Sequence, residues 1–453
     1  MSRLFKRHIG SMRACALAVA AALAAGNAGA ISLQQAYEAA LKNDPTYRMG
    51  YYANEGSKEI RILGRSGLLP SVSASFNGSK NVMDQETTVQ TLLGPRTQLD
   101  HPKYISRSSV VQLRQPLLNM DAVQRYRQGK VQTAQGAEQF EADTNEVAVR
   151  VVSAYMDALF SDEQVALARV QRDAYAEQQK VNQRLFEKGE GTRTDMLETQ
   201  ARLDLAEAML IEAQDGAVAQ RAVLEGIIGG EAGTLDQLSE GFRVGGLMEG
   251  SFEEWSKRAV ENNNELAVAR LAVENTRLEI GRQKAGHLPR IDAIATYSKG
   301  DNETINTRGQ ENLNRSIGVQ VNFPIYSGGA VNAQTRQAAA NYERARADLE
   351  ARTDKVTVEV RKAHSLLQSS VRKVDALVKA VESAKLLMTA TEQSIKGGVR
   401  INLDLLNAQQ QLFTSQRDLA QARYAYLIAV LRLRALTSNI GSQEIREIAA
   451  YFR

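Results

Sequence analysis

Residues 403–437, LDLLNAQQQLFTSQRDLAQARYAYLIAVLRLRALT, place an apolar side chain at every seventh position. The repeating positions are Leu405, Leu412, Leu419, Tyr426 and Leu433. A seven-residue spacing sustained over this length is typical of coiled-coil packing, and a surface helix on an ordinary globular core does not require it. The stretch therefore predicts a long helix with a coiled-coil seam.

The same seam occurs earlier in the chain, which indicates an internal duplication. The pattern Asp404-x-Leu406-x-x-Gln409-x-x-Leu412 is preceded by Asp195-x-Leu197-x-x-Gln200-x-x-Leu203. The earlier seam positions are Met196, Leu203, Leu210, Ala217 and Leu224. Further pairs recur in the same order: helix-capping boxes at Ser32 and Ser251, Leu69-Pro70 and Leu288-Pro289, and Gln115-Pro116-Leu117 and Phe323-Pro324-Ile325. The order predicts a first structural repeat over 31–240 and a second over 241–453.

Each repeat is predicted to run as helix, two strands, long helix, tip and shorter helix. No proline lies between Pro116 and Pro289 or after Pro324, and both stretches are rich in good helix formers. Helical hairpins are expected over about 119–228 and about 328–437, with first arms that would span roughly 105 Å and return arms about half as long. Shorter helices over about 33–66 and 252–286 match the remaining halves. We therefore expect a rod of long helices.

Four segments alternate apolar and polar residues as β-strands do, over about 69–79, 108–117, 289–299 and 316–326. The apolar sets are Val72, Ala74 and Phe76; Val111 and Leu113; Ile291, Ala293, Ala295 and Tyr297, where Ile294 breaks the pattern; and Ile317, Val319, Val321 and Phe323. Ten-residue strands with one apolar face fit an outer-membrane barrel, and they also fit a half-buried sheet in a soluble protein. Polar loops over about 82–107 and 302–315 favour the membrane interpretation.

The number of strands has a consequence for assembly. Four strands cannot close a barrel, because about eight is the practical minimum. An open sheet in lipid would leave the backbone groups of its edge strands unpaired, each at a cost of several kcal/mol. The chain is therefore expected to oligomerise through its sheet edges, and these arguments alone allow two, three or four copies.

The N-terminal residues are predicted to be a secretory signal peptide, residues 1–30. Four basic residues, Arg3, Lys6, Arg7 and Arg13, precede an apolar run from Ala14 to Ala25, and Ala28-Gly29-Ala30 is a small-residue cleavage site. An uncut signal anchor is the alternative. The chain has 56 basic and 52 acidic residues, and the four basic residues in the signal account for the excess, so nothing suggests nucleic-acid binding. Cys15, the only cysteine, also lies in the signal.

The sequence offers little support for an enzyme. The three histidines beyond the signal, His101, His287 and His364, have no metal-ligand spacing, and no phosphate-binding glycine loop or nucleophile elbow is present. No cofactor or metal is expected. A periplasmic coiled-coil adaptor or scaffold is a distant alternative, but two hairpins with barrel-like strands argue against one.

Several motifs resemble those of the TolC-like outer-membrane efflux and secretion channels. They are Gly286-His287-Leu288-Pro289, Phe323-Pro324-Ile325-Tyr326-Ser327-Gly328-Gly329, Gly398-Val399-Arg400-Ile401-Asn402-Leu403-Asp404-Leu405-Leu406 and Ala422-Arg423-Tyr424-Ala425-Tyr426-Leu427. The resemblance covers essentially the whole mature chain. It implies an α+β membrane protein that works as a homotrimer, with a β-barrel in the outer membrane and an α-helical barrel in the periplasm. It also implies a periplasmic adaptor and an inner-membrane ABC or proton-driven transporter as partners.

The resemblance also implies a pore constriction at the tips of the second hairpin. Asp404 matches a position that forms an acidic ring in the channel. The next ring position is Asp in the nearest relatives of the family but Asn407 here, so we expect a milder preference for cations. The plain alternative for Asp404 is a helix-start residue, stabilised by exposed amides and the helix dipole.

Contacts that hold the gate closed are implied at four further positions. Asp195 and Arg400 match a charged pair between neighbouring subunits. Thr194 matches a gate contact whose partner is Tyr in the nearest relatives but Ile395 here, which offers no hydroxyl. Asp195 could equally serve its own helix start, and Arg400 could be a solvated tip residue. The cargo is not readable; the absence of a lipidation cysteine favours type I protein secretion over multidrug efflux.

Overall fold

The computed structural model describes residues 30–239, 242–244, 250–303, 309–437 and 440–453. All but the last residue of the predicted signal peptide lies outside them. The chain forms two compact units, each assembled from separate stretches of sequence. Unit 1 comprises the described residues within 30–51, 141–263 and 355–453, and unit 2 those within 52–140 and 264–354. Each unit therefore combines parts of both sequence repeats.

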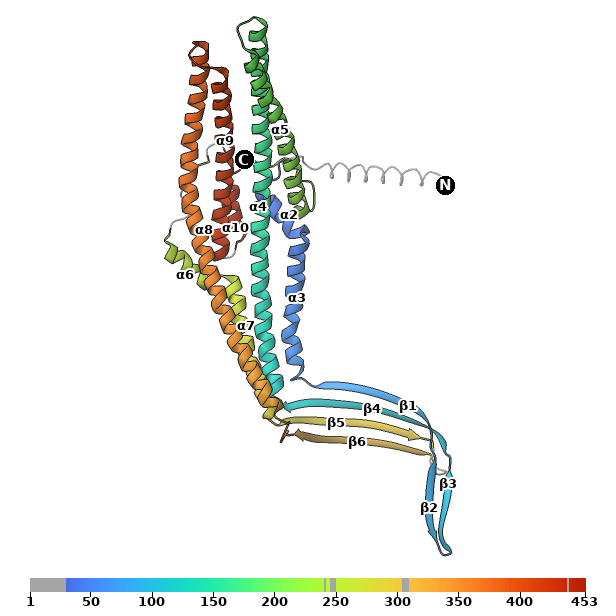
Figure 1. Cartoon of the computed structure of the whole chain (residues 1–453). Helices are drawn as coiled ribbons and strands as arrows, with labels where there is room; N and C mark the ends of the chain where they lie inside the picture. The colour runs from blue at the N-terminus through green and yellow to red at the C-terminus, as the bar shows by residue number, and fades with distance from the viewer. Residues whose placement is uncertain (1–29, 240–241, 245–249, 304–308, 438–439) are drawn as a thin grey trace, which may run out of the picture. The chain divides into compact units, whose positions relative to one another are not determined.

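Unit 1 is built from helices. It contains α2 (Leu33–Asn43), α5 (Arg193–Ile228), α6 (Phe252–Asn262), α9 (Asn402–Thr437), α10 (Ser442–Ala449) and the later parts of α4 (Met120–Glu187) and α8 (Ala330–Lys396). Figure 1 shows α5 running back beside α4, and α9 beside α8. These are the two predicted hairpins, and α10 is a helix that the sequence analysis did not predict.

The coiled-coil seam of α9 lies in the core of unit 1. Leu405, Leu412, Leu419, Tyr426 and Leu433 are all buried, as the seven-residue spacing predicts. Leu419 packs with Val374 of α8, and Leu406 packs with Tyr175 of α4 and Leu203 of α5. Because α9 meets helices of both hairpins, more of its side chains are buried than those of α5. The matching seam of α5 is buried at Leu203, Leu210 and Leu224 and half-buried at Met196 and Ala217.

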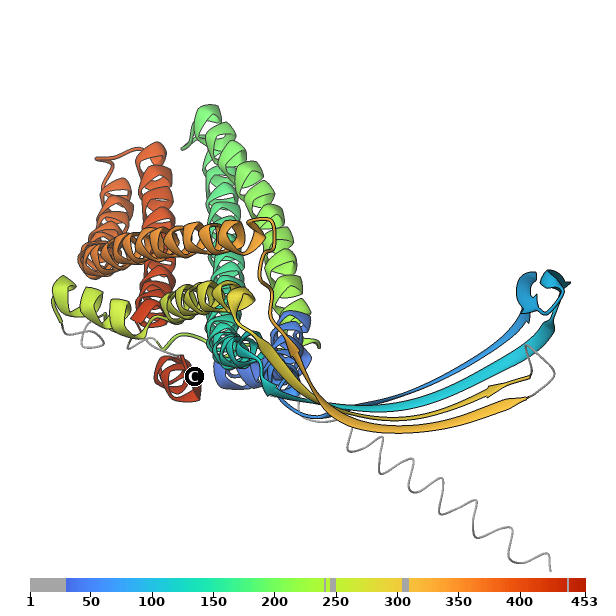
Figure 2. The ribbon, with the colours of Figure 1, turned by 90° about the horizontal axis from the view of Figure 1, so that it is seen from below.

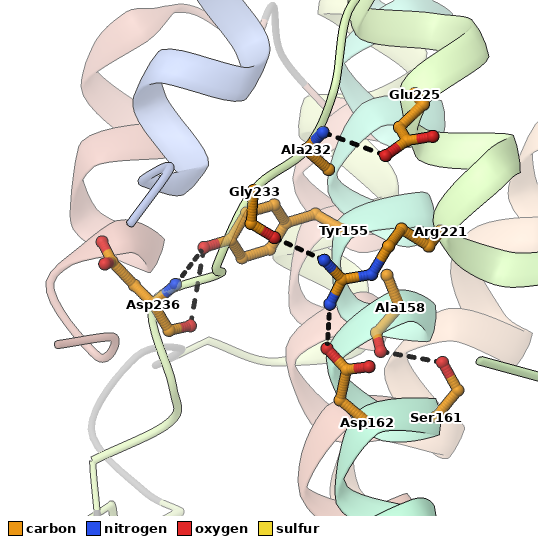
Figure 3. A network of polar contacts seen from close by, with 9 residues as sticks. All are labelled: Tyr155, Ala158, Ser161, Asp162, Arg221, Glu225, Ala232, Gly233 and Asp236. Atoms are coloured by element: carbon orange, nitrogen blue, oxygen red, sulfur yellow. Dashed lines mark hydrogen bonds and ion pairs between the residues drawn. The ribbon is translucent and has the colours of Figure 1, made fainter. Parts of the chain in front are cut away.

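The segment that follows α5 joins the first described residues to the C-terminus. Ile31 forms a parallel bridge with Leu235, and Phe452 forms an antiparallel bridge with Leu238. The buried hydroxyl of Tyr155 donates to the carbonyl of Ile31 at 2.8 Å and accepts from the N–H of Asp236 at 3.0 Å. Figure 3 shows this hydroxyl beside Asp236, with Arg221 of α5 bridging the Gly233 carbonyl and Asp162 of α4. Tyr155 of α4 therefore connects the N-terminal residue Ile31 to Asp236 in the segment after α5.

Unit 2 contains a four-stranded antiparallel sheet. Its strands are β1 (Ser71–Val82), β4 (Lys103–Leu118), β5 (Arg290–Asn302) and β6 (Gln310–Asn322), in the order β1-β4-β5-β6. Figure 2 shows that the sheet is curved along its strands. Unit 2 also holds α7 (Asn264–Lys284), the short η1 (Ala285–His287), most of α3 (Pro45–Ser66) and the earlier parts of α4 and α8.

The strand register places the predicted apolar residues on one face of this sheet. Val72 lies opposite Leu113, Leu113 opposite Ala295, and Ala295 opposite Ile317. Side chains on this face are exposed, with 72% of Phe76 and 90% of Ile317 accessible. The opposite face is mostly polar, with Val110 and Ile294 as exceptions. It carries an ion pair between Arg114 and the buried Asp292, 2.5 Å apart. No described part of the chain covers the apolar face, which is not how a half-buried soluble sheet is built.

The predicted polar loop over 82–107 is wrong in part, because it contains a second sheet. Strands β2 (Gln85–Thr91) and β3 (Gly94–Asp100) form an antiparallel hairpin whose turn, Leu92 and Leu93, is fully exposed. Gly94 has φ of +103°, a backbone angle that favours glycine. Polar residues occupy both faces of the hairpin, so alternation gave no signal. The four-stranded sheet itself was predicted.

Helices α3 and α4 approach closely within unit 2, and two glycines permit it. A Cβ on Gly129 would lie 2.8 Å from the carbonyl oxygen of Ile60, and one on Gly64 would lie 2.8 Å from that of Arg125. Across the same contact, the Thr133 hydroxyl donates to the Ser57 carbonyl at 2.8 Å.

Within the described ranges, no helix combines the length and apolar character needed to cross a membrane.

Candidate gate at the helical hairpin tips

The two hairpin tips in unit 1 have the same backbone design. Helix α4 ends at Glu187 and α8 at Lys396, and each is followed by a glycine with positive φ, Gly189 at 77° and Gly398 at 73°. The glycine N–H binds the carbonyl of Phe186 in one tip and of Ile395 in the other. A left-handed glycine is a common way to end a helix, because it satisfies the last free carbonyls without steric strain.

Asp195 takes part in the cap of its own helix. Its N–H donates to the Thr192 hydroxyl at 3.1 Å, and its carboxylate accepts from that hydroxyl at 2.5 Å and from the Thr192 N–H at 3.4 Å. This is a capping box, which satisfies free amides at both positions. The helix-start interpretation of Asp195 is therefore confirmed within the chain. Its predicted pairing with Arg400 of a neighbouring subunit stays a prediction.

Arg400 lies close to Asp404 in the same chain. The guanidinium of Arg400 is 3.9 Å from the carboxylate of Asp404, and both side chains are exposed to solvent. An exposed pair at this separation contributes under about 1 kcal/mol. Asp404 lies in the first turn of α9, where the helix dipole also favours a carboxylate. The chain thus brings together two of the predicted gate residues, although not the pair that was predicted.

Asn407 contacts a residue that the sequence analysis missed. The guanidinium of Arg202 on α5 donates to the side-chain oxygen of Asn407 on α9 at 3.1 Å. Asn407 is otherwise exposed. A cation therefore lies beside the position where the sequence predicted an uncharged layer. Arg202 precedes the buried seam residue Leu203, and this adjacency was the one available signal that it lies near another helix.

The other two predicted gate positions show no specific contact between their side chains. Thr194 is exposed at the start of α5, and Ile395 is half-buried at the end of α8. The backbone carbonyl of Ile395 accepts from Gly398, as part of the turn. An isoleucine side chain cannot donate a hydrogen bond, so any role for this pair would be steric.

Farther from the tips, α4 and α9 meet through partly buried charged groups. Burial raises the pKa of the Glu163 carboxyl, while the Tyr424 hydroxyl and the charge of Arg423 act in the opposite direction. Burial likewise raises the pKa of Asp157, and Arg432 opposes it. Each carboxyl therefore lies near a cationic side chain of α9, and Glu163 also shares a hydrogen bond with Tyr424.

The three described histidines each contact a different partner. His101 pairs with Asp84, His287 lies 3.1 Å from the amide oxygen of Asn332, and His364 contacts the carbonyl of Gly250. Over the part of the chain that the structure describes, no group of three His, Cys, Asp or Glu side chains could hold a metal ion.

Comparison with known proteins identifies the family. The sequence model of the outer membrane efflux protein family matches residues 36–230 and 255–439, which is most of the chain. The alkaline protease secretion protein AprF of Pseudomonas aeruginosa is 38% identical over 429 residues, covering 94% of this chain and 88% of that protein. The proteases secretion protein PrtF of Dickeya chrysanthemi is 35% identical, covering 97% and 95%. The outer membrane protein TolC of Vibrio cholerae is 28% identical, covering 92% and 93%.

Solved structures agree on the fold. The outer-membrane channel OprN superimposes with a TM-score of 0.77 at 16% identity, covering 91% of this chain and 90% of that one. The outer membrane protein VceC of Vibrio cholerae gives 0.75 at 15% identity, covering 90% and 97%. These matches confirm the fold class that the sequence predicted. From its sequence matches, the chain belongs to the outer membrane efflux protein family, whose members are transport channels and not enzymes.

Proposed function

We propose that this chain is the outer-membrane channel of a type I system that secretes a protein. The observation that carries the proposal is the identity of 38% to a protease secretion protein over 94% of the chain. A second protease secretion protein is 35% identical over 97% of it. Similarity at this level over the full length favours a shared class of cargo, which we take to be a large exported protein.

The channel is proposed to be a homotrimer in the outer membrane. Among the described strands, β1 pairs only with β4 and β6 only with β5, so each of them has one edge without a partner in the chain. Pairing of β1 with β6 of a neighbouring copy would satisfy those edges. The exposed apolar face of the sheet is suited to lipid. A periplasmic adaptor and an inner-membrane transporter complete the export system.

The hairpin tips are proposed to form the gate. Asp404 and Asn407 would line the constriction, with Arg400, Asp195, Thr194 and Ile395 at the contacts that hold it closed. The short distance between Arg400 and Asp404 supports placing these two residues at one position along the channel.

Deletion of the gene tests the secretion role. We expect a particular large protein to disappear from the culture medium, to accumulate in the cells, and to return to the medium on complementation. An unchanged set of secreted proteins would contradict the proposal.

Multidrug efflux is the second candidate, because the family model is that of efflux proteins and OprN is an outer-membrane channel of the same fold. Efflux predicts that the deletion strain becomes hypersensitive to dyes, detergents and antibiotics while its secreted proteins are unchanged. The two readouts therefore separate the candidates.

A further inference from the structure

We propose that four basic side chains on the apolar face of the four-stranded sheet bind the phosphate groups of acylated lipids in the outer leaflet of the outer membrane. Each strand supplies one of them: Lys80 on β1, Arg107 on β4, Lys299 on β5 and Arg315 on β6. We call these four residues the basic row. The inference rests on the proposed outer-membrane channel and adds a lipid site to it.

The basic row lies on the same face of the sheet as the apolar residues. Successive side chains of a strand point to opposite faces, so residues an even number of positions apart share a face. Lys80 is eight positions from Val72 and Arg315 is two positions from Ile317, and the two central strands follow the same rule. The guanidinium of Arg315 lies 5.6 Å from the ring centre of Tyr297, the residue opposite it, which agrees with this placement.

Neighbouring members of the basic row are within reach of one another. Each member lies opposite a residue that is two positions from the next member, so the row crosses the sheet along one diagonal. Diagonal neighbours on one face are about 7–8 Å apart, a distance that long side chains can span. Because the strands of a barrel are tilted, a diagonal across them can run level around the barrel. One lipid headgroup can therefore contact two adjacent members.

The height of the basic row matches the boundary of the membrane. On three strands the basic residue is eight positions from the apolar residue nearest the helices: Lys80 from Val72, Lys299 from Ile291 and Arg315 from Phe323. Eight residues span about 27 Å of strand, or about 21 Å of height at a tilt of about 40°. The apolar band of an outer-membrane barrel is about 25 Å tall. With the helices on the periplasmic side, long basic side chains at this height reach the headgroups of the outer leaflet.

A shallow groove beside the basic row is suited to an acyl chain. It opens between β4, β5 and β6 and is lined by Val111, Leu113, Ala295, Tyr297, Ile317 and Arg315. Apart from Arg315, the side chains on this face of the groove are apolar or aromatic. Arg315 lies at the end of the groove that is farther from the helices. A lipid with one acyl chain in the groove would therefore bring its phosphate to Arg315 and the adjacent Lys299.

The charges of the basic row favour an anionic ligand. Among the described residues, Lys80 and Arg315 form no ion pair, whereas Arg107 lies 3.5 Å from Asp301 and Lys299 pairs with Glu311. The side chains of both pairs are about half exposed, and exposed pairs are weak enough for a phosphate to compete. Two unpaired cations above an apolar groove fit a ligand that carries both phosphate and acyl chains.

Arg315→Gln tests the proposal in the purified trimer. Native mass spectrometry in mild detergent follows the binding of a bisphosphorylated lipid A and of its dephosphorylated form. We expect the phosphorylated lipid to bind more tightly, and Arg315→Gln to weaken its binding about fivefold, the effect of one cation near an anionic membrane surface. Arg290→Gln, at an exposed position on the polar face of β5, is the matched control and should bind as the wild type does. Equal binding of the two lipids, or equal losses in the two variants, would overturn the proposal.

Lys80→Gln covers the case in which Arg315→Gln does not assemble. We expect a similar loss of binding, and unchanged binding would refute a role for the basic row. Inorganic phosphate is the competitor, and it should not displace the lipid, because it makes no contact with the groove. Displacement by inorganic phosphate would show a site for free phosphate and would also refute the lipid site. Wild-type protein that yields no trimer from the membrane fraction would instead contradict the proposed channel, so the two failures are distinguishable.

Discussion

Arg202 on α5 donates a hydrogen bond to Asn407 on α9, with 3.1 Å between the guanidinium nitrogen and the amide oxygen. The return helices of the two hairpins are therefore in direct contact, and a positive charge lies beside Asn407. In the proposed pore, three copies of this charge would oppose the three carboxylates of Asp404. The constriction is then a layer of mixed charge and not a purely acidic ring.

Arg202→Gln should raise the preference of the channel for cations. Removal of the positive charge leaves the Asp404 carboxylates unopposed, and acidic rings favour cations. The reversal potential across a bilayer with a salt gradient measures the change. Arg417→Gln, on α9 and farther from the tip, is the matched control and should leave the reversal potential unchanged. Equal shifts for both variants would mean that Arg202 acts only through net charge.

Asp404→Ala should lower the preference for cations and change stability little. Among the described residues, Arg400 is the one ion-pair partner of the carboxylate, at 3.9 Å, and both side chains are exposed, so the pair adds little stability. A loss of melting temperature with unchanged selectivity would mean that Asp404 is only a helix-start residue.

Asp195→Ala, unlike Asp404→Ala, should lower stability, because the Asp195 carboxylate completes the capping box with Thr192. We expect the start of α5 to lose about 1 kcal/mol of local stability. Hydrogen exchange of the tip amides is the measurement, and exchange as slow as in the wild type would contradict the prediction.

Gly129→Ala should destabilise unit 2. The added Cβ would lie 2.8 Å from the Ile60 carbonyl oxygen, and overpacking of this kind costs about 1–3 kcal/mol. Gly56→Ala, in the neighbouring α3, has nothing within 4 Å of its Cβ and should be neutral or gain up to about 1 kcal/mol. Thermal unfolding compares the two, and equal melting temperatures would show that α3 and α4 are not in close contact.

Glu163→Gln should raise the melting temperature at neutral pH. Burial holds the pKa of this carboxyl above its usual value in the folded chain. A carboxyl with a raised folded pKa favours the folded state when protonated, and that contribution is lost as the pH rises through the folded pKa. The gain over wild type should therefore be present at pH 7 and disappear below the usual pKa of about 4.3. Glu177→Gln, at an exposed position of the same helix, should give no such gain, and a gain that is independent of pH would refute the assignment.

Tyr155→Phe should loosen the segment that follows α5. The hydroxyl binds both the Ile31 carbonyl and the Asp236 N–H, and loss of partners for buried groups costs about 1–3 kcal/mol. Tyr326→Phe, at an exposed position, is the control and should leave stability unchanged. Limited proteolysis near 231–239 is the readout, and unchanged cleavage would indicate that the hydroxyl is not needed there.

The sequence by itself determined the long helices and the four strands of the larger sheet, because their signals are local. The heptad spacing of Leu405, Leu412 and Leu419 indicated the buried face of α9, and that face is buried. The absence of proline indicated a hairpin over about 119–228 with a long first arm, and α4, which is that arm, covers Met120–Glu187. Alternation in the four strands indicated one apolar face, and the strand register places these apolar residues beside one another on one face of the sheet. The β2–β3 hairpin was missed because it has no apolar face.

Only the tertiary structure decided which polar side chains meet. Gln178 and Asn402 are separated by 224 positions in the sequence, and Arg202 and Asn407 by 205. On helices that are polar over most of their surface, an extra Gln, Asn or Arg leaves no periodic signal. The packing of Tyr175 against Leu203, Ala206 and Leu406 sets the rotation and stagger of α4, α5 and α9. That apolar packing brings Asn402 to Gln178 and Arg202 to Asn407, because a hydrogen bond forms only where the packed helices have already placed its two groups within about 3 Å of each other.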